Sequence, residues 1–474
     1  MTHPTSYIRF GTDGWRAIVG EDYTLSNVSR VAAATASWVN ATYGPDASVV
    51  IGHDPRSLGV EAARMSAQVM ASEGIQVYFA DNITPTPAIS WSTKEYGCSA
   101  GIVITASHNA AEYNGFKIKG HFGGSALPEM IEDIEKRIPP STYDNSHIQS
   151  FESYVDQGLI EFRTVRSDYI SVLKTRLNLD LIRSSGMRIV HDAMYGAGRG
   201  IFTELFGADA VVEIHSTVDP TFGGIPPEPI EKNLTELPVR VISEGCAAGI
   251  ANDGDADRVG MCDENGRFVD SHKMMALLVQ YLHEDRGLSG DIVKTLSTTD
   301  MLDAMGKAYG LNVVTTPIGF KYIGGYFLDG NVLVGGEESG GIAVSGHIPE
   351  RDGIYIGALV LEMMAYRKAK LSELVDALSR EYGPHAYFRL DKHTSVEAKD
   401  IALRMLDESG GLSEINGSKV TSLDTLDGYK HRMQEGWLLV RPSGTEPVLR
   451  IYSEAPSAKQ AEAIVMDAVR QLGI

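Results

Sequence analysis

The stretch GIVITASHNAAEYNGFKIKG, residues 101–120, decides how the rest of the chain is interpreted. It begins with the apolar residues Ile102, Val103 and Ile104, which favour a buried strand, and then changes to small and polar residues. A parallel strand that ends in this way delivers polar groups to the edge of a sheet, where ligands bind. Ser107 is therefore a candidate reactive group, although a lone serine after a strand more often caps a helix.

Three further loops of unusual composition follow along the chain. They are NDGDADR at residues 252–258, GGEESGG at 335–341 and RPSGTEP at 441–447. An acidic triplet, a carboxylate pair and a basic Ser/Gly/Thr loop are, together with a serine, the groups that phosphate transfer onto a sugar requires.

The acidic loop predicts a magnesium site. Asp253, Asp255 and Asp257 alternate with small residues, so three carboxylates can converge on one cation, and hard oxygen ligands suit Mg²⁺. The same loop in isolation would be a solvated turn, and no glutamate follows at the place that an EF-hand requires. Arg258 comes directly after the carboxylates and could reach a phosphate held there.

Lys117 lies ten residues after Ser107 and can return to it from the next strand. There it could stabilise negative charge on a transferring phosphoryl group, or act as a base if its pKa is shifted. A solvated strand end accounts for the spacing equally well. A Ser-His hydrolase is disfavoured, because the side chain of the adjacent His108 diverges from the serine in extended backbone and no GxSxG motif is present.

The two remaining loops are candidates for binding a phosphosugar. Glu337, Glu338 and Ser339 lie between glycine pairs, and paired carboxylates hold sugar hydroxyls by charge-assisted hydrogen bonds. A two-carboxylate glycosidase would leave Ser107 and the acidic loop without a role. The last loop offers a guanidinium, two hydroxyls and approachable backbone N–H groups to a phosphate dianion. These groups belong to Arg441, Ser443, Gly444 and Thr445.

Two lysines, Lys294 and Lys321, lie in loops of the same α/β unit as the carboxylate pair. They could add positive charge at the substrate, and either could equally be a surface lysine.

The order strand, chemical loop and helix occurs three times, which predicts three diverged α/β units followed by a smaller α+β domain. Polar, turn-rich stretches at 139–149 and 263–266, and a change of pattern after residue 382, suggest the boundaries. We therefore expect domains at 1–150, 151–263, 264–382 and 383–474. They would carry, in turn, the serine, metal, sugar-binding and phosphate-binding loops.

Composition restricts the class of protein. The 474 residues include 42 Lys and Arg against 62 Asp and Glu, a formal net charge of −20, which argues against a nucleic-acid surface. Cys98, Cys246 and Cys262 have no metal-ligand spacing and cannot all pair, which favours a reducing compartment. No apolar run is long enough to span a bilayer and no signal-peptide core is evident, so we expect a cytoplasmic protein.

With these four loops in this order, the chain resembles the α-D-phosphohexomutase family, and within it the bacterial phosphoglucomutases/phosphomannomutases, over essentially its whole length. The resemblance implies an α/β protein of four domains around a central cleft. Three of them would be similar α/β/α domains, and the fourth an α+β domain related to the TATA-binding-protein fold.

The resemblance also implies roles for individual residues. In the family, the serine matching Ser107 is phosphorylated, and it binds Mg²⁺ together with the aspartates matching Asp253, Asp255 and Asp257. Residues matching Glu337 and Ser339 contact sugar hydroxyls, and the loop matching Arg441, Ser443, Gly444 and Thr445 holds the existing phosphate. Arg16, Lys117 and Arg258 match residues around the transfer site.

The implied reaction interconverts hexose 1-phosphate and hexose 6-phosphate through a hexose 1,6-bisphosphate, with glucose 1,6-bisphosphate as activator. A phosphosugar phosphatase with a serine phosphoenzyme is the alternative from another class.

Departures from the family pattern bear on the sugar. Phe320 stands where dual-specificity phosphomannomutases often have His, and Glu338 where they often have Met, which favours glucose phosphates over mannose phosphates. The GEQSGH sequence of the phosphoglucosamine mutases is absent. Ala110 replaces the usual Pro after Ser-His-Asn, and we expect it to loosen the serine loop without removing a chemical group.

Overall fold

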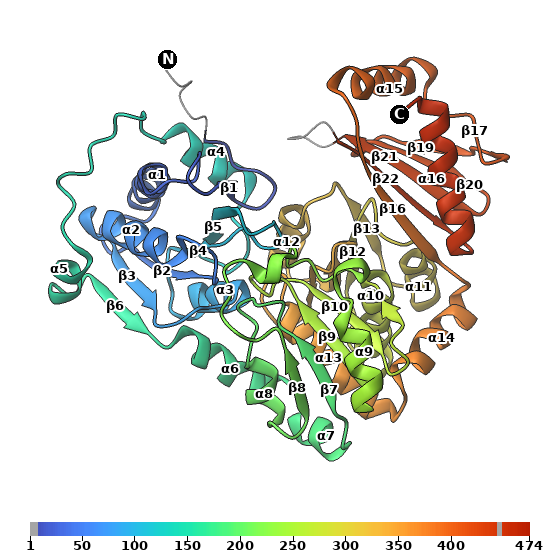
Figure 1. The fold of residues 1–474 in the computed structure, drawn as a ribbon, viewed down its shortest axis with the longest axis horizontal. Coiled ribbons are helices and arrows are strands. Elements are labelled where there is room, and N and C mark those ends of the chain that lie inside the picture. Colours follow the sequence, from blue (N-terminus) through green and yellow to red (C-terminus); the bar gives the residue numbers. More distant parts are fainter. Residues whose placement is uncertain (1–7, 443–447) are drawn as a thin grey trace.

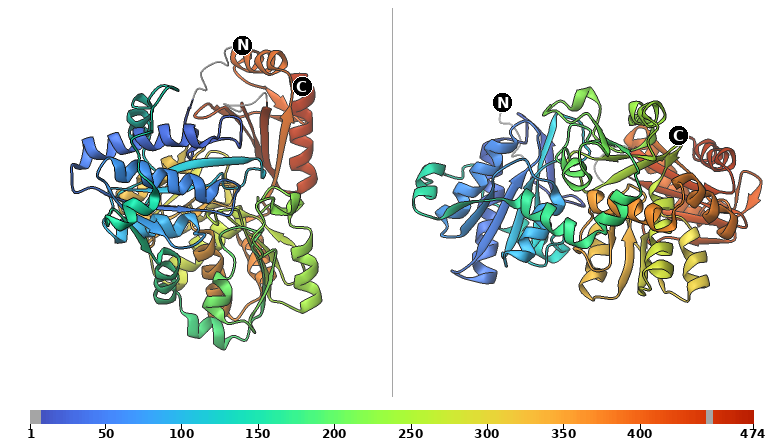
Figure 2. Two further views of the ribbon diagram at one scale, coloured as in Figure 1. Left: turned by 60° about the vertical axis from the view of Figure 1, so that its left-hand side comes forward. Right: turned by 90° about the horizontal axis from the view of Figure 1, so that it is seen from below.

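The computed structural model describes residues 8–442 and 448–474. Four sheets follow one another along the chain, and each belongs to its own domain (Figure 1). The four domains form a row from the N-terminal domain to the C-terminal domain, which is also clear from below (Figure 2, right). The predicted four-domain α/β architecture is therefore confirmed.

The first domain has a six-stranded sheet in the order β1-β5-β4-β2-β3-β6. Its strands are β1 (Trp15–Ile18), β2 (Ser48–His53), β3 (Gln76–Ala80), β4 (Ala100–Ile104), β5 (Tyr113–Gly120) and β6 (Ile160–Arg163). Its helices are α1 (Leu25–Tyr43), α2 (Gly59–Ser72), α3 (Thr86–Glu95), α4 (Pro128–Lys136) and α5 (Phe151–Asp156). The β2–β4 pair is parallel, whereas β5 returns antiparallel to β4 and brings Lys117 opposite Val103.

Local sequence explains the boundaries of α1. The Thr24 side chain accepts a hydrogen bond from the Asn27 N–H and caps the first turn, and Gly44, with φ of 81°, ends the helix. Residues such as Val28, Val31 and Trp38 face the core, as their spacing predicts.

The second domain has a five-stranded sheet in the order β11-β10-β9-β7-β8. Its strands are β7 (Ile189–Asp192), β8 (Val211–Ile214), β9 (Ala248–Asn252), β10 (Val259–Asp263) and β11 (Phe268–Val269). The helices before and within it are α6 (Val165–Arg176), α7 (Leu179–Ser184), α8 (Ile201–Phe206) and α9 (Glu236–Glu244), with short 3₁₀ turns at Phe222–Gly224 and Glu231–Asn233.

The third domain has the sheet β13-β12-β14-β15. Its strands are β12 (Asp291–Thr295), β13 (Val313–Thr316), β14 (Val332–Gly336) and β15 (Ile342–Val344). Its helices are α10 (Ser271–Gln280), continued by a π-helical turn (Tyr281–Asp285), α11 (Met301–Tyr309), α12 (Phe320–Leu328), α13 (Gly353–Arg367) and α14 (Leu371–Tyr382).

The C-terminal domain has a five-stranded antiparallel sheet, β16-β22-β21-β20-β19. Its strands are β16 (Ala386–His393), β19 (Ser422–Asp424), β20 (Tyr429–Met433), β21 (Gly436–Pro442) and β22 (Val448–Ala455), with a separate hairpin of β17 (Glu414–Ile415) and β18 (Ser418–Lys419). The helices α15 (Val396–Ser409) and α16 (Ala458–Leu472) complete it.

The sheets correct two of the expected domain boundaries. Strand β6 lies beyond residue 150 and still pairs with β3 of the first sheet. Asp263 and Gly266 lie in a tight turn of the β10–β11 hairpin, where Gly266 has φ of 77°, so residues 263–266 do not link two domains. A hairpin turn and a domain linker use the same turn-forming residues, and composition cannot distinguish them.

The hydrophobic cores explain how the domains are joined. One continuous core includes Val103 of β4, Ile250 of β9 and Val334 of β14, and so runs through the first three domains. The C-terminal domain has its own core around Leu438, Val440 and α16. Within residues 8–442 and 448–474, none of the helices is both long and apolar enough to cross a membrane.

We predict that Gly115→Ala destabilises the first domain. A Cβ at Gly115 would lie 2.5 Å from the Thr105 carbonyl oxygen and 2.6 Å from that of Trp15, so the strands on both sides of β5 would have to move. Overpacking of this kind lowers the free energy of unfolding by about 1–3 kcal/mol, which thermal or urea unfolding measures.

The matched control is Gly325→Ala on α12, where a Cβ meets nothing within 4 Å. Alanine is the better helix former there, so stability should stay the same or rise slightly. Equal stability of the two variants would contradict the packing argument for β5.

Candidate active site

The structure places Ser107 directly after β4, fully buried, in a strained backbone conformation. Its φ is 55°, in the left-handed region that residues other than glycine seldom adopt. Its N–H donates to Thr105 Oγ1 at 2.8 Å, and its Oγ donates to Asp253 Oδ2 at 2.7 Å. The turn therefore points the hydroxyl at the acidic loop of the second domain. The expected divergence of His108 does not hold, because the backbone at Ser107 is left-handed and His108 Nδ1 lies 3.4 Å from Ser107 Oγ.

Arg56 fixes the backbone of this loop and was missed as a site residue in the sequence. Its guanidinium donates to four carbonyl oxygens, at 2.6 to 2.9 Å, of Ser107, Asn109, Ala110 and Tyr113. The bond to Ala110 restrains the position where the usual proline is absent. The sequence feature that could have identified Arg56 is HDPR at residues 53–56. It begins at the last residue of β2, the parallel neighbour of β4.

The three aspartates of the acidic loop converge as predicted. Asp253, Asp255 and Asp257 each offer a carboxylate oxygen within 4.8 Å of the others, and all three are fully buried. Burial, and then repulsion from Asp255 and Asp257, holds the pKa of the Asp253 carboxyl well above its usual range. Oδ1 of Asp255 and Oδ1 of Asp257 are buried with no hydrogen-bond partner, so the donor set fits a hard divalent cation.

Backbone contacts with all three α/β domains hold the acidic loop in place. The carbonyl oxygens of Asp255, Gly254 and Ala256 accept hydrogen bonds at 2.9, 2.9 and 3.2 Å. Their N–H donors are, in the same order, Thr86, Ala197 and Gly353. The Thr86 hydroxyl also donates to Asp255 Oδ2 at 2.6 Å. The candidate metal site therefore lies where the three domains meet.

Lys117 lies against the acidic loop, as its spacing from Ser107 suggested. Its Nζ is 2.8 Å from Asp255 Oδ2, 2.9 Å from Asp257 Oδ2 and 2.8 Å from Asp13 Oδ2. Burial alone would lower the pKa of Lys117, but the three carboxylates raise it well above its usual value. For the Asp255 carboxyl, burial alone would raise the pKa, but the Lys117 charge more than offsets this and the pKa lies below its usual value. Lys117 is thus a permanent cation here, which favours charge stabilisation over the base role.

The two predicted arginines flank the same point. Arg16 Nη1 donates to Asn109 Oδ1 at 2.6 Å, within the serine loop. The Arg258 N–H donates to Asp253 Oδ1 at 3.0 Å, and its side chain lies 3.7 Å from Glu228. The Arg16 guanidinium therefore contacts the serine loop, and the charge of Arg258 acts on Asp253, where it opposes the rise in the pKa of that carboxyl.

The carboxylate loop joins the acidic loop directly. The Val259 N–H, just after the aspartates, donates to the Gly340 carbonyl oxygen at 3.1 Å. Glu337 is buried, and burial raises the pKa of its carboxyl to about 7 although Arg351 opposes this shift. The Glu338 carboxylate instead accepts a hydrogen bond from Ser297 Oγ at 2.6 Å. Glu337 and the half-buried Ser339 thus remain the candidate sugar ligands.

Arg351 links the metal and sugar loops and was not identified in the sequence, where PERDG at 349–353 matches no general motif. Its guanidinium lies 2.9 Å from Asp257 Oδ2 and 3.7 Å from Glu337 Oε2, and also pairs with Asp13. Gly341 permits this position, because a Cβ there would lie 2.3 Å from Arg351 Cδ. Asp13, which both Lys117 and Arg351 contact, lies in the FGTDGWR loop with Arg16.

Among the described residues, the polar partners of Lys294 all lie in the third domain, and its expected role at the substrate stays a prediction. Lys294 Nζ is buried, donates to the Thr299 carbonyl oxygen at 2.7 Å and pairs with Asp300 and Asp303. Its charge is therefore neutralised within the third domain.

Lys321 lies in the first turn of α12 and is half-buried, with its Nζ 5.3 Å from the Tyr322 ring centroid. Arg441 is the last residue but one of β21 and pairs with Asp427 at 2.9 Å. Ser443, Gly444 and Thr445 lie outside the described residues.

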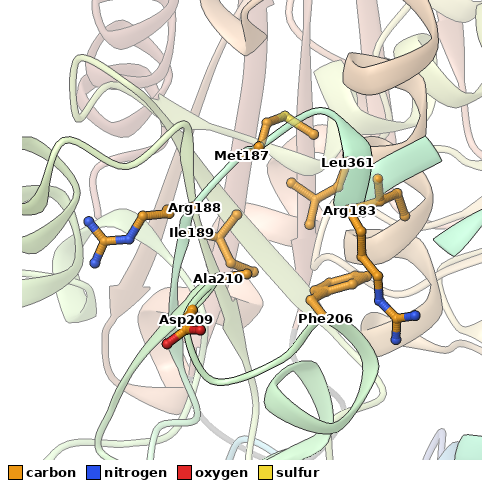
Figure 3. A pocket seen from close by; sticks show the side chains of 10 residues that line it. Arg183, Met187, Arg188, Ile189, Phe206, Asp209, Ala210 and Leu361 are labelled. Atoms are coloured by element: carbon orange, nitrogen blue, oxygen red, sulfur yellow. The ribbon is translucent and has the colours of Figure 1, made fainter. Parts of the chain in front are cut away.

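A separate cavity of about 180 Å³ lies in the second domain, against Leu361 of α13 (Figure 3). It is mostly apolar, and Arg183 and Arg188 direct their guanidinium groups away from its centre. None of the described residues of the four loops lines it. We therefore assign it no part in the chemistry.

Comparison with known families agrees with this geometry. The phosphoglucomutase/phosphomannomutase models match in chain order: α/β/α domain I at residues 8–144, domain II at 167–266, domain III at 270–382 and the C-terminal domain at 395–471.

Individual relatives extend over nearly the whole chain. A phosphoglucomutase/phosphomannomutase of Thermococcus kodakarensis is 32% identical over 95% of this chain and 95% of its own length. A phosphoglucosamine mutase of Moorella thermoacetica is 32% identical over 96% and 97%. A crystal structure from Thermus thermophilus, described as a phosphomannomutase candidate, has a TM-score of 0.87 at 32% identity and covers 99% of this chain and 100% of its own. The chain therefore belongs to the phosphoglucomutase/phosphomannomutase family and is a phosphohexomutase, an intramolecular phosphotransferase.

Proposed function

We propose that the protein interconverts glucose 1-phosphate and glucose 6-phosphate, with mannose phosphates as poorer substrates, through a phosphoserine at Ser107 and a hexose 1,6-bisphosphate. The observation that carries the proposal is the position of Ser107 Oγ, 2.7 Å from Asp253 and beside a three-aspartate site that Lys117 partly neutralises. These groups supply a phosphoryl carrier, ligands for a divalent cation and a fixed positive charge.

In the forward direction, phospho-Ser107 would donate its phosphoryl group to the free 6-hydroxyl of glucose 1-phosphate. The bond from phosphorus to the serine oxygen breaks while the bond to the sugar oxygen forms. Lys117, which contacts the acidic loop, and Arg16, which contacts the serine loop, would stabilise the negative charge on the transferring group together with Arg258. Mg²⁺ bound by Asp253, Asp255, Asp257 and the phosphoserine would add Lewis-acid charge stabilisation to each transfer.

The bisphosphate must then turn round, so that its 1-phosphate reaches Ser107. Arg441 would hold whichever phosphate is not reacting, while Glu337 and Ser339 accept and donate hydrogen bonds at the sugar hydroxyls. Lys321, at the start of α12, would add charge near the bound phosphosugar. Exclusion of water during this step separates a mutase from a phosphatase.

The choice of sugar rests on the residues around Glu337. Phe320 and Glu338 occupy positions where mannose-accepting relatives often carry His and Met. Relatives named phosphoglucosamine mutase make glucosamine 1-phosphate the competing substrate. The absence of GEQSGH in this chain supports glucose over glucosamine.

The direct test is phosphorus NMR with Mg²⁺, a trace of glucose 1,6-bisphosphate, and the 1-phosphates of glucose, mannose and glucosamine in parallel samples. We expect conversion to the 6-phosphates without free phosphate, fastest for glucose. Ser107→Ala should lower turnover by at least about a thousandfold, because the covalent carrier is lost, while glucose 6-phosphate still binds.

Ser171→Ala, at an exposed serine on α6, is the matched control and should behave as the wild type. Inorganic phosphate as the only product would favour the phosphatase, and near-normal turnover by Ser107→Ala would remove the assigned carrier. Faster conversion of glucosamine 1-phosphate would overturn the sugar assignment.

We predict a pH dependence that originates at Glu337. An ionised carboxylate accepts hydrogen bonds from sugar hydroxyls best, so kcat/KM should rise through pH 7, where burial sets the pKa of this group at about 7. Glu337→Gln should lose this rise but keep the one near pH 6 that belongs to the substrate phosphate. An unchanged profile in Glu337→Gln would exclude this assignment.

The raised pKa of Glu337 also predicts how its contribution to stability changes with pH. The pKa of Glu337 is raised on folding, from about 4.3 in the unfolded chain. Its contribution to stability is therefore fully present below about pH 4.3 and is lost as the pH rises through 7. Glu337→Gln should accordingly gain stability relative to the wild type between pH 5 and pH 8 in thermal unfolding experiments.

We further predict opposite effects of Asp253→Asn with and without Mg²⁺. In metal-free protein the variant should be more stable than the wild type, because it relieves repulsion from Asp255 and Asp257. Mg²⁺ at about 100 times its Kd should stabilise the wild type by about 2.7 kcal/mol and the variant far less. Calorimetry with Mg²⁺ or EDTA measures both effects.

The matched control is Asp209→Asn, at an exposed carboxylate. It should change neither the stability of the metal-free protein nor the stabilisation by Mg²⁺. A full Mg²⁺ response in Asp253→Asn would place the metal elsewhere.

A further inference from the structure

We propose that Asp427 is a positioning residue that couples phosphate binding by Arg441 to the contact between the C-terminal and third domains. The inference rests on the proposed function, because it takes Arg441 as a ligand of the substrate phosphate. Asp427 lies outside the four loops, and the coupling would help to retain the bisphosphate.

Asp427 bridges two domains with its two carboxylate oxygens. Oδ1 accepts a hydrogen bond from Arg441 Nε at 2.9 Å, and Oδ2 accepts one from the Ile318 backbone N–H at 2.9 Å. The Asp427 and Arg441 side chains are 22% and 17% exposed, so water screens this pair only in part. One carboxylate therefore orients the arginine and contacts the third domain at the same time.

The backbone beside Asp427 is closely packed, which fixes the direction of the carboxylate. Gly428 has φ of 97°, and a Cβ there would lie 2.6 Å from the Val440 carbonyl oxygen on β21. Only glycine fits this close approach. Asp427 thus sits on a rigid turn beside β21, the strand that carries Arg441.

The partner loop, residues 317–319, lies between the first and C-terminal domains. A Cβ at Gly319 would lie 3.8 Å from Thr12 Cγ2, in the loop of the first domain that also carries Asp13 and Arg16. The same loop leads into α12 with Lys321. Asp427 therefore connects Arg441, through the Ile318 N–H, to a loop that contacts the segment with Asp13 and Arg16.

Other contacts between these two domains do not involve Arg441. Arg432 Nη1 pairs with Asp300 at 2.7 Å, and Lys430 Nζ donates to the Leu296 carbonyl oxygen at 2.8 Å. These bonds can maintain the interface when Asp427 is altered. In the described part of the chain, Asp427 is the carboxylate that connects the interface to Arg441.

The chemistry of the guanidinium explains the coupling. Asp427 uses Nε, and a phosphate dianion can be bound through the two terminal nitrogen atoms, so carboxylate and phosphate lie on different edges of one planar cation. A phosphate bound in this way favours the orientation of Arg441 in which Asp427 contacts Ile318. Substrate binding and domain contact then stabilise each other, which keeps the bisphosphate enclosed while it turns.

The test compares Asp427→Asn with Asp424→Asn, a control on the neighbouring strand β19 whose carboxylate caps the Leu426 N–H. Asparagine keeps the shape but loses the charge and one of the two acceptors. For Asp427→Asn we expect KM for glucose 1-phosphate to rise about tenfold or more. We also expect hexose 1,6-bisphosphate to escape at each turnover, so that activity requires continuous addition of glucose 1,6-bisphosphate.

A second readout does not depend on turnover. In Ser107→Ala, glucose 6-phosphate should reduce the radius of gyration measured by X-ray scattering, and the added Asp427→Asn change should abolish that reduction. Unchanged thermal unfolding of Asp427→Asn would separate positioning from general stability.

The outcomes are distinguishable. If the wild type isomerises none of the hexose phosphates, the proposed function fails, and the coupling, which requires a bound phosphosugar, fails with it. A raised KM without bisphosphate escape would limit Asp427 to orienting Arg441 and overturn the coupling. Wild-type behaviour of Asp427→Asn, or an equal effect of Asp424→Asn, would overturn the whole inference.

Discussion

The structure depends on one buried ionic cluster, in which the Lys117 ammonium contacts Asp13, Asp255 and Asp257. Three carboxylates this close would repel one another in a buried site, and a lysine from β5 of the first domain makes their approach possible. Removal of one partner of such a buried pair typically destabilises a protein by about 3–5 kcal/mol. The Lys117 charge therefore both joins the first two domains and allows the three aspartates to converge.

This cluster gives the acidic loop two roles. Its carboxylates face the serine, while its backbone carbonyls are bonded to residues of the first, second and third domains. A distortion at any of these three junctions would move the candidate metal ligands. The C-terminal domain differs, because it has its own core. It contacts the third domain through a small apolar cluster of Leu296 with Trp437 and through polar pairs such as Arg432 with Asp300. The fold thus places the serine and the three aspartates at the junction of three domains, whereas Arg441 comes from the separate C-terminal domain.

Much of the fold and the centre of the site could be predicted because their signals are local. Glycine stops and apolar periodicity define α1, and runs of branched residues define β4. Arg56 and Arg351 were missed because their importance arises from bonds to residues distant in sequence. The ion pair of Lys294 with Asp303 was not predicted either, since the sequence of that loop does not show which carboxylate the lysine contacts. The boundaries near 150 and 263 could not be predicted, because strand pairing decides which sheet a segment joins.

The sequence by itself determined the order of the domains, the serine, the three aspartates and the family, because each is encoded in a short contiguous motif. Only the tertiary structure decided which charged side chains pair with one another. It assigned Lys117 to three carboxylates, Arg351 to both the metal and sugar loops, and Asp427 to the junction with Arg441. The physical reason is that burial and electrostatic pairing depend on distances across the fold, and spacing along the chain does not specify those distances.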